Sequence, residues 1–193
     1  MLSVAPRVFE IEDFLSDVEV DHILELGKVM DLGESSTGQG GDKISKSDSR
    51  TSRNTWVDRE TSPIIDAIYR RAADLLRIDE AEFRWRHEEE DHISRKLSTR
   101  HTIAESLQLV HYDVRQQYTA HHDFGYTALS FEPYQNARFA TLLFYLNEGM
   151  TGGETTFPRW MSADTGKKLT VTPKRGKVCE ARQIYIHVYI YIY

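Results

Sequence analysis

The residues best suited to chemistry are a histidine and an aspartate one residue apart, His121 and Asp123. Residues i and i+2 of a β-strand point to the same face, so both side chains can bind one metal ion while His122 points away. One imidazole, one carboxylate and a second histidine from elsewhere are the ligands of non-haem Fe(II) centres, which leave three coordination positions open. The pair alone is weak evidence, because His-x-Asp arises often by chance and usually lies on the surface.

Two helices and a series of strands are expected to position this pair. A capping-box pattern at Ser16 begins one helix, and Ser62-Pro63 begins a second. From Leu107 onward, β-prone runs separated by turn residues follow one another: LQLVHY, QYTAHHDF, RFATLLFYLN, ETTF and KLTVTP. Helices first and strands afterwards predict an α+β fold, in which the helices support one face of a strand sandwich or barrel.

Composition limits the class of protein. A chain of 193 residues with 40% hydrophobic residues is expected to form one domain over residues 1–193. A net charge of −6 argues against a nucleic-acid partner, which needs clustered lysine and arginine. No run approaches the roughly 18 apolar residues of a membrane span, so the chain as written is expected to be soluble. The single cysteine, Cys179, does not indicate a redox compartment.

Three further segments carry specific expectations. Residues 34–54 are rich in glycine and serine and predict a long mobile loop, of a kind that is often functional. Residues 85–100 are dense in charge and contain His87 and His92, but spacing i, i+5 suits no shared ligation, which favours a solvated insert. Gly152 and Gly153 predict a turn with positive φ.

The order of five motifs carries a resemblance to a known family: LVHY, YxxHxD, R-AT-LFYLN, GGETTFP and TPKRG. Together they resemble the catalytic domain of prolyl 4-hydroxylases over roughly residues 7 to 177. The resemblance implies a double-stranded β-helix, or jelly roll, with N-terminal supporting helices. It also implies Fe(II), 2-oxoglutarate as co-substrate and ascorbate. His121 and Asp123 would ligate the iron, and Tyr112 and Thr155 would line the 2-oxoglutarate pocket. Tyr118 is expected to face the opposite side and has no assigned role.

The implied activity is hydroxylation of proline in a peptide or protein. An extended, polyproline-like substrate would lie along a groove with aromatic residues such as Trp56 and Tyr126, and the 34–54 loop is the candidate lid. Two alternatives stay open: a truncated, non-catalytic product, and a sibling oxygenase acting on another protein side chain. The endoplasmic reticulum is implied if an N-terminal signal has been lost.

The resemblance stops after Gly176-Lys177. A relative would continue with a second iron-binding histidine and then a basic residue that pairs with the tail carboxylate of 2-oxoglutarate. This chain continues as VCEARQIYIHVYIYIY, which suggests a truncated gene product. His187 is the one histidine left to complete the triad, and both a ligand and a chance occurrence remain open. No basic residue follows Arg182. The alternating Ile-Tyr run is β-prone and uncharged, so we expect an exposed, aggregation-prone tail.

Overall fold

The computed structural model describes residues 1–4, 7–35, 50–84, 102–121, 123, 139–162, 165–185 and 187–192. Their elements follow the predicted order, helices first and most strands afterwards. They are β1 (Ser3–Val4), β2 (Arg7–Ile11), α1 (Asp17–Val29), β3 (Gly33–Glu34), β4 (Arg53–Val57), η1 (Arg59–Thr61), α2 (Pro63–Leu76), η2 (Glu80–Phe83), β5 (Leu107–His111), β6 (Phe139–Tyr145), β7 (Thr155–Met161), β8 (Lys168–Val171), β9 (Val178–Tyr185) and β10 (His187–Ile192).

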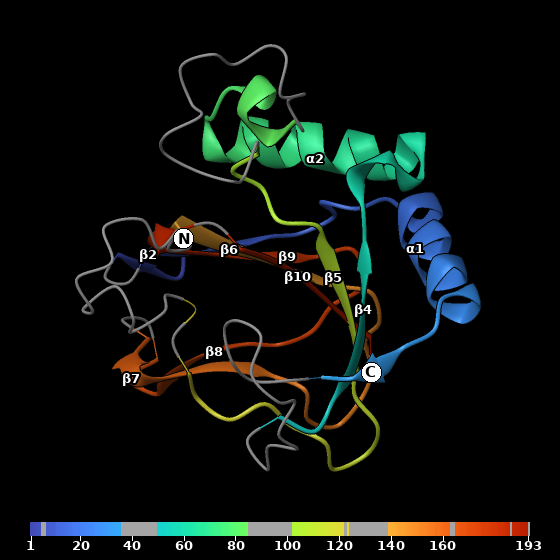
Figure 1. Ribbon diagram of the computed structural model, residues 1–193. Coiled ribbons are helices and arrows are strands. Elements are labelled where there is room, and N and C mark those ends of the chain that lie inside the picture. The colour runs from blue at the N-terminus through green and yellow to red at the C-terminus, as the bar shows by residue number, and fades with distance from the viewer. Residues whose placement is uncertain are drawn as a thin grey trace, which may run out of the picture.

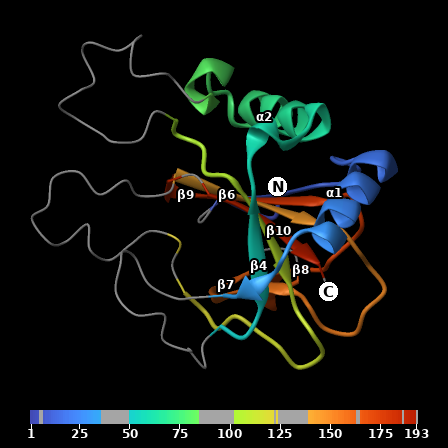
Figure 2. The same cartoon turned by 45° about the vertical axis from the view of Figure 1, so that its right-hand side comes forward.

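The described elements form three layers. A large sheet has the order β1-β2-β9-β6-β10-β5-β4-β3, and β7 and β8 form a second, two-stranded sheet. Helices α1 and α2 lie on one side of the large sheet and the β7–β8 pair lies on the other (Figures 1 and 2). The predicted α+β class is therefore confirmed. None of the described helices is long and apolar enough to cross a bilayer.

Both predicted helices begin at the expected caps. The Ser16 hydroxyl accepts a hydrogen bond from the Glu19 amide, and the Glu19 carboxylate accepts one from the Ser16 amide at 2.9 Å. Ser62 accepts from the amide of Ile65 at 3.2 Å, with Pro63 in the first turn of α2. Each cap satisfies backbone N–H groups that a helix start leaves without a partner, which stabilises it by about 1 kcal/mol.

The helical layer packs on one face of the large sheet through a continuous apolar core. Its fully buried members include Ile23 of α1, Ile65 of α2, and Leu142 and Phe144 of β6. The ring of Phe14 stacks on that of Phe144 with centroids 5.5 Å apart. Alternate residues of β6, such as Leu143, belong to a second apolar cluster on the opposite face. The alternation of side chains along β6 thus serves both layers.

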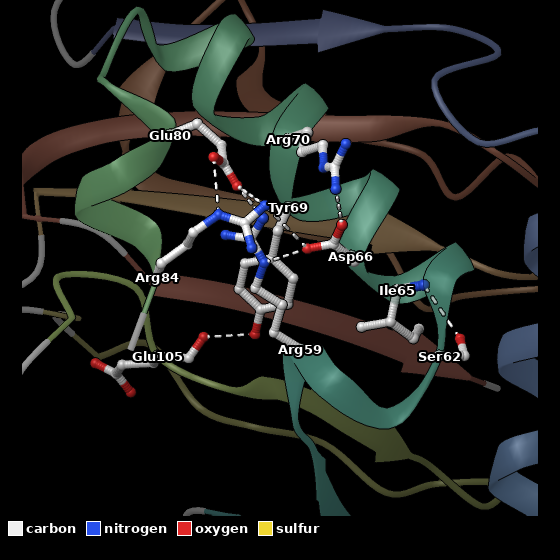
Figure 3. A network of polar contacts seen from close by, with 9 residues as sticks. All are labelled: Arg59, Ser62, Ile65, Asp66, Tyr69, Arg70, Glu80, Arg84 and Glu105. Atoms are coloured by element: carbon white, nitrogen blue, oxygen red, sulfur yellow. Dashed lines mark hydrogen bonds and ion pairs between the residues drawn. The ribbon is translucent and has the colours of Figure 1, made fainter. Parts of the chain in front are cut away.

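A polar network holds α2 against its surroundings (Figure 3). The guanidinium of Arg59, which is 7% exposed, donates to the carboxylates of Asp66 and Glu80. The Tyr69 hydroxyl donates to the backbone carbonyl of Glu105 at 2.9 Å. Burial raises the pKa of the Asp66 carboxyl, but the hydrogen bond from Arg59 lowers it, and the net pKa lies below its usual value. These bonds join η1 and η2 to α2, and α2 to the segment that precedes β5.

The C-terminal run is incorporated into the sheet, which corrects one expectation. β10 lies between β6 and β5, parallel to both, with His187 opposite Thr141 and Ile190 opposite Leu109. A strand paired on both sides presents no free edge, so its backbone is not the exposed template that the sequence suggested. Composition predicted the strand, but it could not predict which neighbours would pair with it.

Two other segments are described only in part. The ends of the 34–54 loop are joined, because Glu34 pairs with Arg53 and the Ser35 amide donates to the Ser52 carbonyl at 2.9 Å. Its middle, residues 36–49, lies outside the described residues, as do the charged insert with His87 and His92 and the candidate groove residue Tyr126. The predicted glycine turn is confirmed, since φ is +94° at Gly152 and +80° at Gly153.

Candidate functional site

A cavity of about 1140 Å³ opens between the large sheet and the β7–β8 pair. Its walls come from β6, β7 and β9 and from the segment that follows β5. The residues proposed as iron ligands or 2-oxoglutarate contacts on either side of the cavity line it: Tyr112, His121, Asp123 and Thr155. Residues up to 43 positions apart in the chain (155 − 112 = 43) therefore border one cavity.

The two candidate ligands are not held by a strand. The predicted strand over QYTAHHDF is wrong for the described residues, because the segment has only one isolated bridge, between Tyr118 and Arg50. The side chains of His121 and Asp123 nevertheless meet, with Nε2 and Oδ1 3.0 Å apart. Strand alternation predicted that these two side chains would lie together, but the local structure that brings them together is not a strand. Bonds from each side chain to other groups bring the two together.

The tautomer of His121 follows from its partner. Nδ1 lies 2.8 Å from the backbone carbonyl oxygen of Thr119. A carbonyl only accepts, so Nδ1 carries a proton and donates to it, which leaves Nε2 as the ring nitrogen available to a metal. Metal-binding histidines use this same arrangement, in which the second nitrogen is tied to a carbonyl or carboxylate. His121 therefore presents the correct atom for a metal.

Asp123 is held by β6. Its Oδ2 accepts a hydrogen bond from the Thr141 hydroxyl at 2.5 Å, which leaves Oδ1 directed at His121. The Asp123 side chain is 17% exposed, so this bond forms largely away from water. One carboxylate oxygen is thus anchored to the sheet and the other faces the imidazole.

The pair fits a metal ion. Nε2 of His121 and the carboxylate Oδ1 of Asp123 are both atoms that bind metals, and they lie 3.0 Å apart. Metal–nitrogen and metal–oxygen bonds of about 2.1 Å at right angles put cis ligands about 3.0 Å apart. The observed separation matches that geometry. The residues present therefore suit an octahedral metal with open positions.

A third protein ligand is not found among the described side chains. In that part of the chain no three histidine, cysteine, aspartate or glutamate side chains gather closely enough to hold a metal. The backbone register puts His187 of β10 opposite Thr141, the residue that holds Asp123. Cys179 also lines the cavity, but burial raises the pKa of its thiol to about 12. The thiol is therefore protonated at neutral pH and is a poor ligand.

Tyr118 belongs to the site, contrary to the sequence expectation. Its ring stacks on the imidazole of His121, with centroids 3.6 Å apart and planes 17° from parallel. The guanidinium of Arg50 lies 4.8 Å from the centroid of the same tyrosine ring. The expectation failed because it assumed strand alternation between residues 118 and 121. The pattern of residue types gave no signal for Arg50, which lies 68 residues earlier (118 − 50 = 68).

The predicted co-substrate residues lie on two walls of the cavity. Tyr112 is 6% exposed and follows β5, whereas Thr155 begins β7. The Tyr145 hydroxyl, which the sequence analysis did not single out, donates to Thr155 Oγ1 at 2.8 Å. A hydroxyl that accepts one bond can still donate its own proton, so Thr155 suits an anionic ligand. The lysine and arginine residues of the described cavity lining, Arg115 and Arg159, are exposed.

The chain is similar in sequence to known prolyl 4-hydroxylases, although no protein-family model matches it. The sequence is 30% identical over 186 residues to the probable prolyl 4-hydroxylase 7 of Arabidopsis thaliana, an alignment that covers 94% of this chain and 52% of that protein. The chain thus spans about half the length of the curated relatives it matches. The predicted resemblance to prolyl 4-hydroxylases is confirmed.

Two solved structures share the fold. One is the viral collagen prolyl hydroxylase of Paramecium bursaria Chlorella virus-1 in complex with 2-oxoglutarate, with a TM-score of 0.56, 21% identity, and coverage of 91% of this chain and 77% of that chain. The other is a prolyl-4-hydroxylase of Pseudomonas putida, with a TM-score of 0.59, 18% identity, and coverage of 92% and 81%. These likenesses establish a mixed helix and strand architecture similar to that of prolyl hydroxylase domains.

Proposed function

We propose that this chain is an Fe(II)- and 2-oxoglutarate-dependent dioxygenase domain that hydroxylates proline in a peptide or protein. The observation that carries the proposal is the close approach of two candidate ligand atoms, His121 Nε2 and Asp123 Oδ1, 3.0 Å apart at the wall of a cavity. The similarity to prolyl 4-hydroxylases supports the choice of iron and of proline. The facing sheets and the cavity between them also support the double-stranded β-helix as the finer description of the fold.

The roles of the residues follow from their contacts. His121 and Asp123 would hold Fe(II), with the Thr119 carbonyl and the Thr141 hydroxyl fixing the two ligands. Tyr112 and Thr155 would bind 2-oxoglutarate through their hydroxyl groups. The bound iron supplies the oxidation, in which O2 and 2-oxoglutarate give succinate, CO2 and a hydroxyl group in place of one hydrogen of the proline ring. Ascorbate would return oxidised iron to the ferrous state.

The protein's own contribution is position and exclusion of water. Leu143 and Phe157 line the same cavity as the ligands and give it apolar walls. A proline ring carried on an extended peptide would enter from the surface. Trp56, which is 45% exposed on β4, remains our candidate for a contact with that peptide, although it does not line the cavity. Such peptides are already ordered, which lowers the entropy cost of binding.

Metal binding and turnover test the proposal separately. Purified protein would be titrated with Co(II), a spectroscopic substitute for Fe(II), and then assayed with Fe(II), 2-oxoglutarate and a proline-rich peptide for succinate and hydroxyproline. His121→Ala is expected to abolish both signals. His111→Ala is the matched control, because His111 contacts Arg53 and Asp113 outside the cavity.

Each outcome selects one interpretation. Hydroxyproline formed in proportion to succinate supports the proposed reaction. Metal binding without hydroxyproline on any peptide, but with hydroxylation of another side chain, selects the sibling oxygenase. Equal turnover by wild type and His121→Ala would refute the assigned site. A wild-type chain that folds but binds no metal would be the non-catalytic scaffold.

A further inference from the structure

The contacts around His121 include one that metal binding itself does not require. A carbonyl bond to Nδ1 sets the tautomer, but it leaves the ring free to tilt about that bond. The ring of Tyr118 covers one face of the imidazole at 3.6 Å and nearly parallel to it. A ring packed flat against the imidazole blocks its rotation toward that side. The contact therefore restricts the tilt and helps to aim Nε2 at Asp123.

The ring of Tyr118 is itself in contact with Arg50. The guanidinium of Arg50 lies 4.8 Å from the tyrosine centroid, on a residue that is only 7% exposed. Arg50 donates to the Gln108 side chain on β5 at 3.2 Å and to the Ser52 hydroxyl at 3.4 Å. Both of these hydrogen-bond partners are neutral, and the face of the Tyr118 ring adds a cation–π contact to them. Such a contact is stronger where it is removed from water, as it is at this buried arginine.

The backbone reinforces the same pair of segments. Arg50 and Tyr118 form an antiparallel bridge. The Thr51 amide donates to the Gln117 carbonyl at 3.1 Å, and the Gln117 amide donates to the Thr51 hydroxyl at 3.0 Å. The segment that leads into β4 therefore holds the residue that packs on the imidazole. The aromatic contact is built by the fold, because both partners of the stack are tied down.

We propose that Tyr118, supported by Arg50, is a positioning residue that keeps the His121 imidazole in its metal-binding orientation. The inference rests on the proposed metal site and adds to it a role for the tyrosine ring, as distinct from its hydroxyl. A metal site needs its ligands held within about 0.5 Å and 10–20° of the bound geometry. Residues that orient a ligand without touching the metal typically change metal affinity by 10–100-fold when replaced.

Two replacements of Tyr118 separate the ring from the hydroxyl. Tyr118→Phe keeps the ring and is expected to bind Co(II) within about twofold of wild type. Tyr118→Leu loses the ring and is expected to bind about tenfold more weakly. Arg50→Met, which removes the charge behind an intact ring, is expected to lie between them. The control is Phe9→Leu, because Phe9 carries a similar contact with Arg182, 5.7 Å away, outside the cavity.

A second readout needs no metal. Proton NMR of the metal-free protein should show the ring protons of His121 shifted upfield by the tyrosine ring current, with the signals assigned by their loss in His121→Ala. Tyr118→Leu should remove the upfield shift and Tyr118→Phe should keep it. Thermal unfolding of each variant identifies any that does not fold, in which case Arg50→Met carries the test.

The possible failures are distinguishable. If Tyr118→Leu binds Co(II) as tightly as wild type, the positioning role is refuted while the metal site stands. If Tyr118→Phe is as weak as Tyr118→Leu, the hydroxyl is responsible and the ring-stacking proposal is refuted. If wild type and His121→Ala bind Co(II) equally, the metal site itself fails, and the proposal fails with it.

Discussion

The hydrogen bond from Thr141 to Asp123 offers a sharp test of how the site is organised. Thr141→Val replaces the hydroxyl with a methyl group of similar size, so the packing of β6 is kept while the donor to Oδ2 is lost. A hydrogen bond to a charged group is worth about 1.5–3 kcal/mol. With 1.36 kcal/mol per factor of ten, complete loss corresponds to roughly 10–150-fold in metal affinity. Asp123 is 17% exposed, so water can replace part of the bond, and we expect roughly tenfold.

The assay is a Co(II) titration of wild type and two variants under identical conditions. Thr170→Val is the matched control, because the Thr170 hydroxyl donates to the Lys168 carbonyl on the exposed side of β8, outside the cavity. Thr141→Val should raise the dissociation constant about tenfold, whereas Thr170→Val should leave it unchanged. Equal affinities for the two variants would refute the reasoning, because Asp123 would then be oriented without Thr141.

Three further outcomes are expected. Arg59→Met should lower the free energy of unfolding, measured by urea denaturation, by about 2 kcal/mol. This is less than the 3–5 kcal/mol expected for breaking a fully buried ion pair, because Asp66 and Glu80 are partly exposed. An unchanged free energy of unfolding would mean that the network does not stabilise the fold. The folded-state pKa of Asp66 is below its ordinary value, so its contribution is present above about pH 4 and is lost as pH falls through the lowered pKa. Wild-type stability should therefore drop more steeply below pH 4 than that of Arg59→Met, and parallel pH profiles would contradict this. His187→Ala should weaken Co(II) binding, since the register puts His187 opposite Thr141, and unchanged affinity would exclude it as a ligand.

The parts of the fold that depend on local chemistry were predictable. Helices α1 and α2 begin where Ser16 and Ser62 can cap them, and the strands β5 to β8 coincide with β-prone runs. Their signals lie within a few residues, since capping and alternation act over that range. That the side chains of His121 and Asp123 would lie close together was also predictable, because few residue types bind metals and the surrounding motifs restricted the choice.

The contacts that hold the side chains of His121 and Asp123 in place could not be predicted in the same way. Asp123 is fixed by Thr141, 18 residues later, and His121 by a ring whose own partner, Arg50, lies 71 residues before it (121 − 50 = 71). Neither contact leaves a periodic pattern, because each depends on how distant segments pair. The same holds for β10. Its residue types predict a strand, but its parallel pairing with β5 and β6 depends on how the whole sheet assembles.

This division between local ligands and distant supports has a thermodynamic consequence. His121 and Asp123 are close in sequence, so an unfolded chain retains both groups, but it loses the contacts with Thr141 and Tyr118 that aim them at one point. Metal would therefore bind the folded state preferentially, and a ligand that does so stabilises it by about 2.7 kcal/mol at 100 times the dissociation constant. Each supporting contact that raises metal affinity also raises this stabilisation. If the proposed metal binds, the orientation of these two side chains and the stability of the sheets that orient them would be coupled through one ion.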